Sequence, residues 1–247
     1  MQSAFSGKKE KIAALLLAAG SGKRFGTDTP KQFLMLDETP MLLYSVDALL
    51  PYVDRLIVVT REDRIGETER ILEDAGLLSE VEVIAGGKER YESSMKGLEA
   101  LETGLPCGFV LIHDSARCML TGEIVRRVIE GVVEHGAVVA AIPAKDTMKI
   151  VSSEGKVLKT PDRKACQTVQ TPQAFRTSLI RRAYEKAGEE NALSLLTDDA
   201  SAVERFTDAE VYVVPGSEEN FKVTTPFDFM MAEAVLTARR LKKEAEA

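Results

Sequence analysis

Two basic side chains follow a loop of small residues near the start of the chain. The stretch 15–34 reads LLLAAGSGKRFGTDTPKQFL, in which an apolar run leads into Gly20 and Gly22 and then to Arg24 and Lys31. Such a loop brings backbone amides close to a base or a phosphate, and the cations beyond it can reach phosphate oxygens. The segment therefore predicts a phosphate-binding turn at the end of a buried strand.

Two familiar nucleotide motifs are absent from this segment. A dinucleotide fingerprint needs glycine where Phe25 stands, and a Walker loop needs glycine at Leu17 and a hydroxyl at Arg24. An ordinary strand-to-loop turn with a solvated basic end is the alternative, and for the glycines alone it is the better one. Arg24 and Lys31 together favour phosphate binding.

A second glycine turn, GGKERYESS (86–94), again follows an apolar run and precedes a helical pattern. Gly86 and Gly87 permit a tight turn, while Arg90 and Ser93 can hydrogen-bond a nucleobase or ribose. A glycine turn followed by a capped, charged first helical turn explains the same residues equally well.

A carboxylate ends the apolar run FVLIHD, at HDSAR (113–117). An acid at the end of a central strand is more often functional than structural, because a buried unpaired carboxylate is costly. We expect Asp114 and Arg117 to face one crevice, and His113 to be a core histidine on the other side.

Three further basic residues stand among hydroxyls and turns: Lys149 in DTMK, Arg163 in TPDR and Lys222 in NFKVTTP. Each alone reads as a solvated surface charge. Their settings, away from helix faces, favour phosphate binding.

Alternating apolar runs and helical patterns predict the elements that hold these residues. Near-continuous apolar runs indicate strands covered on both faces: 12–18, 55–60, 81–86, 109–114, 137–143 and 211–215. Helical spacing occupies 40–50, 63–75, 90–102 and 122–136, the last with Thr121 as a possible cap. The alternation predicts an α/β fold with three layers and a mostly parallel sheet.

Residues 144–171, called the arm below, break this rhythm. They are polar, alternate like an exposed hairpin turning near Glu154 and Gly155, and lack the large apolar residues of a core. We expect the arm to project and pack on a partner. QTPQAF, two helices, a strand and a final helix follow, so that 11–240 form one domain with flexible ends at 1–10 and 241–247.

Composition excludes several classes of function. The net charge is −7, which disfavours nonspecific nucleic-acid binding. No apolar window is long enough for a membrane span or a signal peptide, so we expect a cytoplasmic protein without a membrane partner. Two histidines and three unpaired cysteines leave little room for a catalytic triad, a zinc site or a disulfide framework.

The ordered set LAAGSGKRFG, PKQF, GGKER, HDSAR, DTMK, TPDR, QTPQAF, LTDDAS and NFKVTTP resembles the 2-C-methyl-D-erythritol 4-phosphate cytidylyltransferase family, from Ile12 to about Ala234. Ribitol-5-phosphate cytidylyltransferases share most of these motifs, and TDDASAVE favours the methylerythritol family. Ser115, Cys118 and Lys88 depart from the usual pattern, which bears on substrate preference more than on the reaction.

The resemblance implies a Rossmann-like nucleotidyltransferase fold and a reaction that joins CTP to a polyol phosphate and releases pyrophosphate. The attacking phosphate oxygen is already anionic, so the chemistry needs cations and Mg²⁺ (or another divalent cation) more than a nucleophilic side chain. The metal ligands are left open.

The resemblance also implies roles for individual residues. The basic residues for catalysis are Arg24, Lys31, Arg163 and Lys222. Those for the nucleotide are Ala18, Ala19, Gly20, Ser21, Gly22, Gly87, Arg90 and Ser93. Arg117 and Thr147 would hold the polyol phosphate, and Asp114 would hold substrate hydroxyls or assist the metal. A homodimer whose arms cross to the other subunit is implied as well.

Two other classes fit parts of the sequence. A nicotinamide-dependent dehydrogenase would share the sheet and a glycine turn, but only Glu62 could bind its ribose. A noncatalytic nucleotide-binding module would not need Lys31, Arg163 and Lys222 together.

Overall fold

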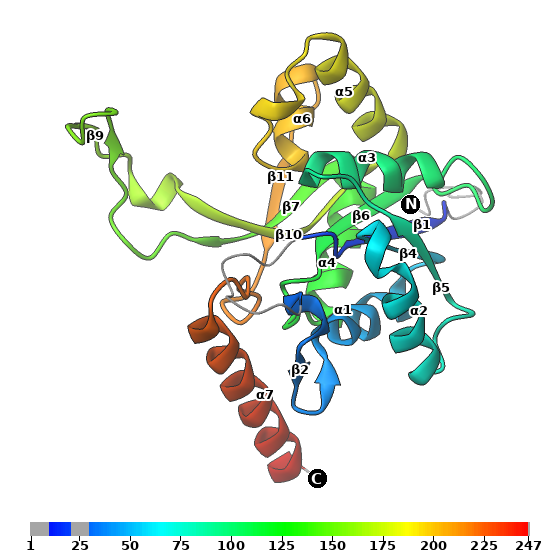
Figure 1. Cartoon of the computed structure of the whole chain (residues 1–247). Coiled ribbons are helices and arrows are strands. Elements are labelled where there is room, and N and C mark those ends of the chain that lie inside the picture. Colours follow the sequence, from blue (N-terminus) through cyan, green and yellow to red (C-terminus); the bar gives the residue numbers. More distant parts are fainter. Residues whose placement is uncertain (1–9, 21–29, 247) are drawn as a thin grey trace, which may run out of the picture.

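A mostly parallel sheet forms the centre of the computed structural model, which describes residues 10–20 and 30–246 (Figure 1). Within these residues the sheet has seven strands in the order β11-β7-β10-β6-β1-β4-β5. Their bounds are β1 Ile12–Leu17, β4 Arg55–Thr60, β5 Val81–Ala85, β6 Phe109–Asp114, β7 Ala137–Pro143, β10 Gln167–Arg176 and β11 Tyr212–Pro215. All six apolar runs predicted as strands are confirmed.

The antiparallel strand β10 was not predicted. It lies between β6 and β7 and pairs with both in the antiparallel sense, whereas the other neighbouring strands of the sheet run parallel. Its sequence QTVQTPQAFR is polar, yet Gln170, Thr171 and Gln173 are buried. β10 begins at Gln167, so residues 167–171, expected as part of the arm, already belong to the sheet.

Helices cover both faces of the sheet, which confirms the three-layer α/β fold. Side chains of β1 alternate between the two layers: Ala14 and Leu16 pack on one face, Ala13 and Leu15 on the other. The first face is covered by α1 Met41–Leu49, α2 Ile65–Asp74 and α4 Gly122–His135. The second is covered by α3 Arg90–Ala100, α5 Thr177–Glu189 and α6 Asp199–Phe206.

The ends of α4 show one correction to the sequence prediction. Thr121 occupies the N-cap position, but its side chain makes no capping hydrogen bond, so the predicted side-chain cap is wrong. At the other end Gly136 adopts a φ of 82°, and its N–H donates to the carbonyl of Val132. A left-handed glycine ends the helix here at no steric cost.

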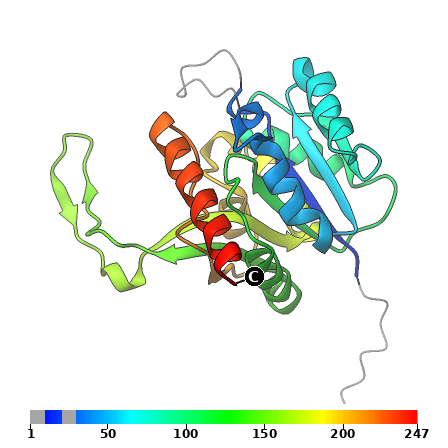
Figure 2. The same cartoon turned by 90° about the horizontal axis from the view of Figure 1, so that it is seen from below.

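The arm projects from the body of the protein, as predicted (Figures 1 and 2). Its two strands, β8 Ile150–Val151 and β9 Val157–Lys159, pair antiparallel, and Gly155 in the turn has a φ of 83°. The apolar side chains of Ile150 and Leu158 are exposed.

The last helix, α7 Pro226–Glu246, packs against a third apolar cluster that includes Met41 and Val223. It runs through residues 241–246, which we expected as a flexible end. The small hairpin of β2 Met35–Leu36 and β3 Thr39–Pro40 lies beside it. Among the helices of the described residues, none has the length and apolar character needed to cross a membrane.

Candidate active site

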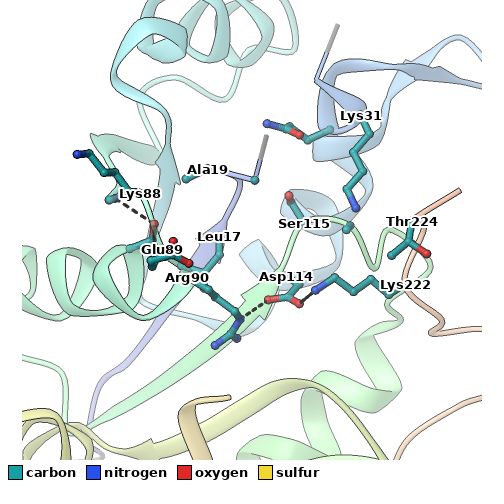
Figure 3. A pocket seen from close by; sticks show the side chains of 15 residues that line it. Leu17, Ala19, Lys31, Lys88, Glu89, Arg90, Asp114, Ser115, Lys222 and Thr224 are labelled. Atoms are coloured by element: carbon teal, nitrogen blue, oxygen red, sulfur yellow. Dashed lines mark hydrogen bonds and ion pairs between the residues drawn. The ribbon is translucent and has the colours of Figure 1, made fainter. Parts of the chain in front are cut away.

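A cavity of about 420 Å³ opens at the carboxyl ends of β1 and β6 (Figure 3). In parallel sheets ligands bind at this edge, because the loops that follow the strands converge there. The lining residues come from four separate parts of the chain: Leu17, Ala19, Gly20, Lys31, Gln32, Gly87, Lys88, Glu89, Arg90, Ser93, Asp114, Ser115, Ala116, Lys222 and Thr224.

The glycine turn after β5 forms one wall. The Ser93 hydroxyl accepts a hydrogen bond from the N–H of Gly87 (3.1 Å). A Cβ at Gly86 would lie 2.8 Å from Ser93 Oγ and 2.9 Å from the Cβ of Ala19, so only glycine lets these two loops approach so closely.

The capped helix start, considered above as an alternative to nucleotide binding, is also present. Glu89 and Glu92 form a capping box at the start of α3, in which the Glu92 carboxylate accepts from the N–H groups of Lys88 (2.6 Å) and Glu89 (3.1 Å). Capping therefore fixes the turn, and the turn still lines the cavity.

Asp114 forms the floor of the cavity, between two cations. Its Oδ1 accepts from Arg90 Nε (3.0 Å), and its Oδ2 accepts from Lys222 Nζ (2.6 Å), as Figure 3 shows. Burial alone would raise the pKa of this carboxyl, but the charges of Arg90 and Lys222 outweigh it and hold the pKa well below its usual range. Asp114 is thus a buried anion at neutral pH.

Arg90 is shared by two carboxylates. Besides Asp114 it contacts Asp199, whose Oδ2 lies 2.7 Å from Arg90 Nη2. Burial opposes the charged guanidinium, yet the attraction of Asp199 and Asp114 raises the pKa of Arg90 above its ordinary value. The predicted hydrogen bond from Arg90 to a nucleobase or ribose stays a prediction.

Lys31 joins the first and last loops of the cavity. Its Nζ donates to the backbone carbonyl of Val223 (2.6 Å), 192 residues further along the chain. The neighbouring Gln32 is buried and donates from Nε2 to the carbonyl of Ala18 (2.6 Å), which fixes the turn that carries Lys31 against β1. In Figure 3 Lys31 and Lys222 reach toward the same space.

Arg117 lies beside the cavity and is not part of its lining. Its guanidinium donates to the carbonyls of Asn220 (2.9 Å) and Val169 (3.4 Å), and burial lowers the pKa of Arg117. His113 is fully buried, with Nδ1 3.0 Å from Thr171 Oγ1, as expected for a core histidine.

Two predicted residues of the arm, Thr147 and Arg163, are not part of the cavity lining in this chain. Thr147 and Arg163 lie in the arm, where Arg163 Nη1 donates to the carbonyl of Lys145 (3.1 Å). Ser21, Gly22 and Arg24 lie outside the described residues. Of the predicted set, the cavity lining includes Ala19, Gly20, Lys31, Gly87, Arg90, Ser93, Asp114 and Lys222, and Ala18 carries the carbonyl that Gln32 binds.

Several cavity residues had no predicted role. Gln32, Ala116 and Thr224 stand inside motifs that the sequence analysis recognised, PKQF, HDSAR and NFKVTTP. Gln32 directly follows Lys31, Ala116 directly precedes Arg117, and Thr224 stands two residues after Lys222; these neighbours were the available signal. Asp199 also stands inside a quoted motif, LTDDAS, but its contact with Arg90 joins α6 to α3 and does not show in the chain order.

A family model described as "IspD: 2-C-methyl-D-erythritol 4-phosphate cytidylyltransferase" matches residues 12–238. The chain is 42% identical over 229 residues to the enzyme of that name from Geotalea uraniireducens, and 38% identical over 229 residues to that from Lachnoclostridium phytofermentans. In both cases 92% of this chain and 97% of the relative are covered.

Solved structures agree with the sequence matches. The crystal structure of 4-diphosphocytidyl-2C-methyl-D-erythritol synthase from Anaerococcus prevotii is similar with a TM-score of 0.80 at 31% identity, and covers 92% of this chain and 99% of its own. That of 2-C-methyl-D-erythritol 4-phosphate cytidylyltransferase from Thermus thermophilus has a TM-score of 0.74 at 28% identity with the same coverage. The fold is thus the Rossmann-like nucleotidyltransferase fold, and the chain belongs to the 2-C-methyl-D-erythritol 4-phosphate cytidylyltransferase family.

Proposed function

We propose that this chain transfers the cytidylyl group of CTP to 2-C-methyl-D-erythritol 4-phosphate, giving 4-diphosphocytidyl-2-C-methyl-D-erythritol and pyrophosphate for isoprenoid biosynthesis. The observation that carries the proposal is the meeting of Lys31, Lys222 and Asp114 in one cavity with the glycine turn at Gly87. The ribitol 5-phosphate reaction is the second candidate, because the two families share most motifs.

The chemistry that this cavity must perform is electrostatic. One phosphate oxygen attacks the α-phosphate of CTP, and negative charge grows on that phosphate and on the departing pyrophosphate. Cations that are already in place stabilise this charge without reorganisation of water. We assign Lys31 and Arg24 to the triphosphate and Lys222 to the polyol phosphate; no side chain has to act as a strong base.

Cytidine would bind against the walls of the cavity that are built from small residues. Ala19, Gly20 and Gly87 line the cavity, the buried Ala18 supports them from behind through its hydrogen bond with Gln32, and the buried hydroxyl of Ser93 keeps the glycine turn in position. A pyrimidine can be recognised by backbone N–H and C=O groups at such a wall, where larger side chains would keep it out. Ser21 and Gly22, which lie outside the described residues, are assigned to nucleotide binding by the family resemblance alone.

The carboxylate of Asp114 beside a bound triphosphate would suit Mg²⁺. It takes one or two carboxylates together with substrate phosphates, and keeps several waters. In the described residues no group of three or more histidine, cysteine, aspartate or glutamate side chains could hold an ion by itself. Asp114 would therefore hold the ion jointly with CTP, or else bind substrate hydroxyls. The ion would neutralise phosphate charge.

We further propose that two chains form a homodimer in which each arm completes the partner's cavity. The exposed apolar side chains of Ile150 and Leu158 support this, since a projecting hairpin without a core of its own gains stability from a partner. Thr147, Arg163 and Arg117 would then hold the methylerythritol phosphate from two sides. The cytoplasmic location stays a prediction from the sequence.

Pyrophosphate release tests the function directly. Purified protein is incubated with CTP and Mg²⁺ and with either 2-C-methyl-D-erythritol 4-phosphate or ribitol 5-phosphate. We expect release with the first acceptor only. Release with ribitol 5-phosphate alone would transfer the assignment to the second family, and CTP binding without release would leave only a nucleotide-binding module.

A further inference from the structure

A buried acid outside the cavity is held in contact with the arginine that contacts Asp114. Asp199 stands in the first turn of α6, and none of its side chain is exposed. Burying an unpaired carboxylate costs several kcal/mol. Its partners offset this cost: Oδ1 accepts from the hydroxyls of Tyr184 (2.6 Å) and Ser94 (2.7 Å), and Oδ2 faces Arg90.

Arg90 connects the buried Asp199 to the cavity. Its Nη2 forms an ion pair with Asp199 at 2.7 Å and its Nε donates to Asp114 at 3.0 Å, so neighbouring nitrogens of one planar guanidinium face two different carboxylates. A guanidinium whose Nη2 is attracted to one carboxylate has little freedom to turn its Nε away from the other, because its nitrogens are coplanar. The orientation of Asp114, and of Lys222 on its other oxygen, therefore depends on Asp199.

The charges of the four groups balance. Asp114 and Asp199 supply two negative charges, and Arg90 and Lys222 supply two positive ones. Without Asp199, Arg90 would have one carboxylate partner where it now has two, and would be free to follow Asp114 toward the cavity. The cavity lining includes Arg90, Asp114 and Lys222, but not Asp199, Tyr184 or Ser94.

We infer that Asp199, held by Tyr184 and Ser94, is a positioning residue for catalysis, which acts through Arg90 to fix Asp114 and Lys222 against the reacting phosphates. The inference rests on the proposed cytidylyl transfer.

Asp199→Asn tests this, with Asp198→Ala as the matched control. Asparagine keeps the size and an oxygen acceptor, but loses the charge that holds Arg90. Asp198 is the neighbouring N-cap of α6; its carboxylate accepts from the N–H of Ser201 (2.9 Å) and from Gln173 Nε2 (2.8 Å), and not from Arg90. Both variants weaken the start of α6, so stability alone does not separate them.

We expect kcat of the folded Asp199→Asn protein to fall about tenfold or more, since small displacements of catalytic groups are costly. The KM for CTP should change less than about threefold, and kcat of Asp198→Ala should stay within about twofold of wild type. Equal kcat values for the two variants at similar melting temperatures would overturn the inference.

A milder variant serves if Asp199→Asn does not fold. Tyr184→Phe removes one hydroxyl from Asp199 and keeps every charge. A kcat lowered about threefold at unchanged KM supports the inference, and wild-type kcat overturns it. A wild-type chain that releases no pyrophosphate would remove the proposed function itself; active wild type with an unaffected kcat in both variants removes only the inference.

Discussion

His113 and Asp114 are neighbours in β6, yet the protein keeps one neutral and the other charged. His113 is fully buried, and burial lowers its pKa to about 4. Asp114 is buried too, but Arg90 and Lys222 stabilise its charge and lower the pKa of its carboxyl. The difference lies in the available partners: Asp114 has two cations, and His113 has a threonine hydroxyl and a backbone carbonyl.

The pKa of His113 predicts a loss of stability in mild acid. An unfolded histidine titrates near pH 6.5, so between about pH 6.5 and 4 the unfolded chain binds a proton that the folded chain does not. The His113 contribution to the unfolding free energy is complete above about pH 6.5, and falls by up to about 3 kcal/mol as the pH drops to about 4.

Urea unfolding at several pH values between 4.5 and 7.5 measures this. His113→Gln should flatten the dependence of the unfolding free energy on pH, whereas His135→Gln should keep the His113 contribution. An equally steep dependence in His113→Gln would contradict the assignment of this loss to His113.

At the scale of elements, the start of α7 fixes one wall of the cavity. Thr225 and Asp228 form a reciprocal cap: Asp228 Oδ2 accepts from the N–H of Thr225 (2.8 Å), and Thr225 Oγ1 accepts from the N–H of Asp228 (3.2 Å). The same carboxylate oxygen binds both the N–H and the hydroxyl of Thr224, which lines the cavity. Helix stability and cavity shape are therefore linked through Asp228.

Asp228→Ala should lower the unfolding free energy by about 1 kcal/mol, the usual cost of losing a cap. It should also raise the KM for the polyol phosphate, because the Thr224 loop loses its anchor. Glu233→Ala, an exposed position further along α7, is the control and should change the unfolding free energy by less than about 0.5 kcal/mol. Unchanged stability in Asp228→Ala at equal protein concentration would refute the capping role.

Strands with apolar sequences could be predicted from the sequence, and β10 could not. The six apolar runs needed only burial on both faces to be recognised. Gln173 in β10 is stable inside the sheet because its amide accepts from the N–H of Ala200 (3.0 Å) and donates to Asp198 (2.8 Å). Those partners lie 25 or more residues away, so no local pattern shows them.

In the candidate active site, too, single residues could be predicted from the sequence and their contacts could not. A carboxylate at the end of β6 and a cation at Lys222 could each be predicted from its setting, but their ion pair spans 108 residues. The role of Gln32 could not be predicted for a related reason. Its side chain holds the Lys31 turn through one hydrogen bond to the carbonyl of Ala18, and only the folded chain brings these two groups together. Residue types could be predicted, and pairings depended on the fold.

For the whole molecule, the arm determines whether the active site belongs to one chain or to two. The arm, whose sequence includes Thr147 and Arg163, extends away from the body (Figure 2). Lys31 and Lys222 line the cavity. If each arm completes the partner's cavity, two defective variants can form one complete site between them.

Mixing Arg163→Ala with Lys222→Ala tests this crossing. In mixed dimers one site joins an intact cavity to an intact arm, so random mixing should restore about a quarter of wild-type activity. Native mass spectrometry confirms that mixed dimers form. The control pair, Asp114→Asn with Lys222→Ala, has both changes in the cavity and should stay inactive. Mixed dimers without recovered activity would mean that each arm serves its own chain.

The central claim is that cations distant in the sequence gather to stabilise charge on reacting phosphates, and kcat of Lys31→Ala tests it most directly. At saturating CTP and methylerythritol phosphate we expect kcat to fall on the order of 10²-fold or more. Lys186→Ala, an exposed lysine on α5 outside the cavity, should leave kcat within about twofold of wild type. Near-normal turnover by Lys31→Ala would contradict the account.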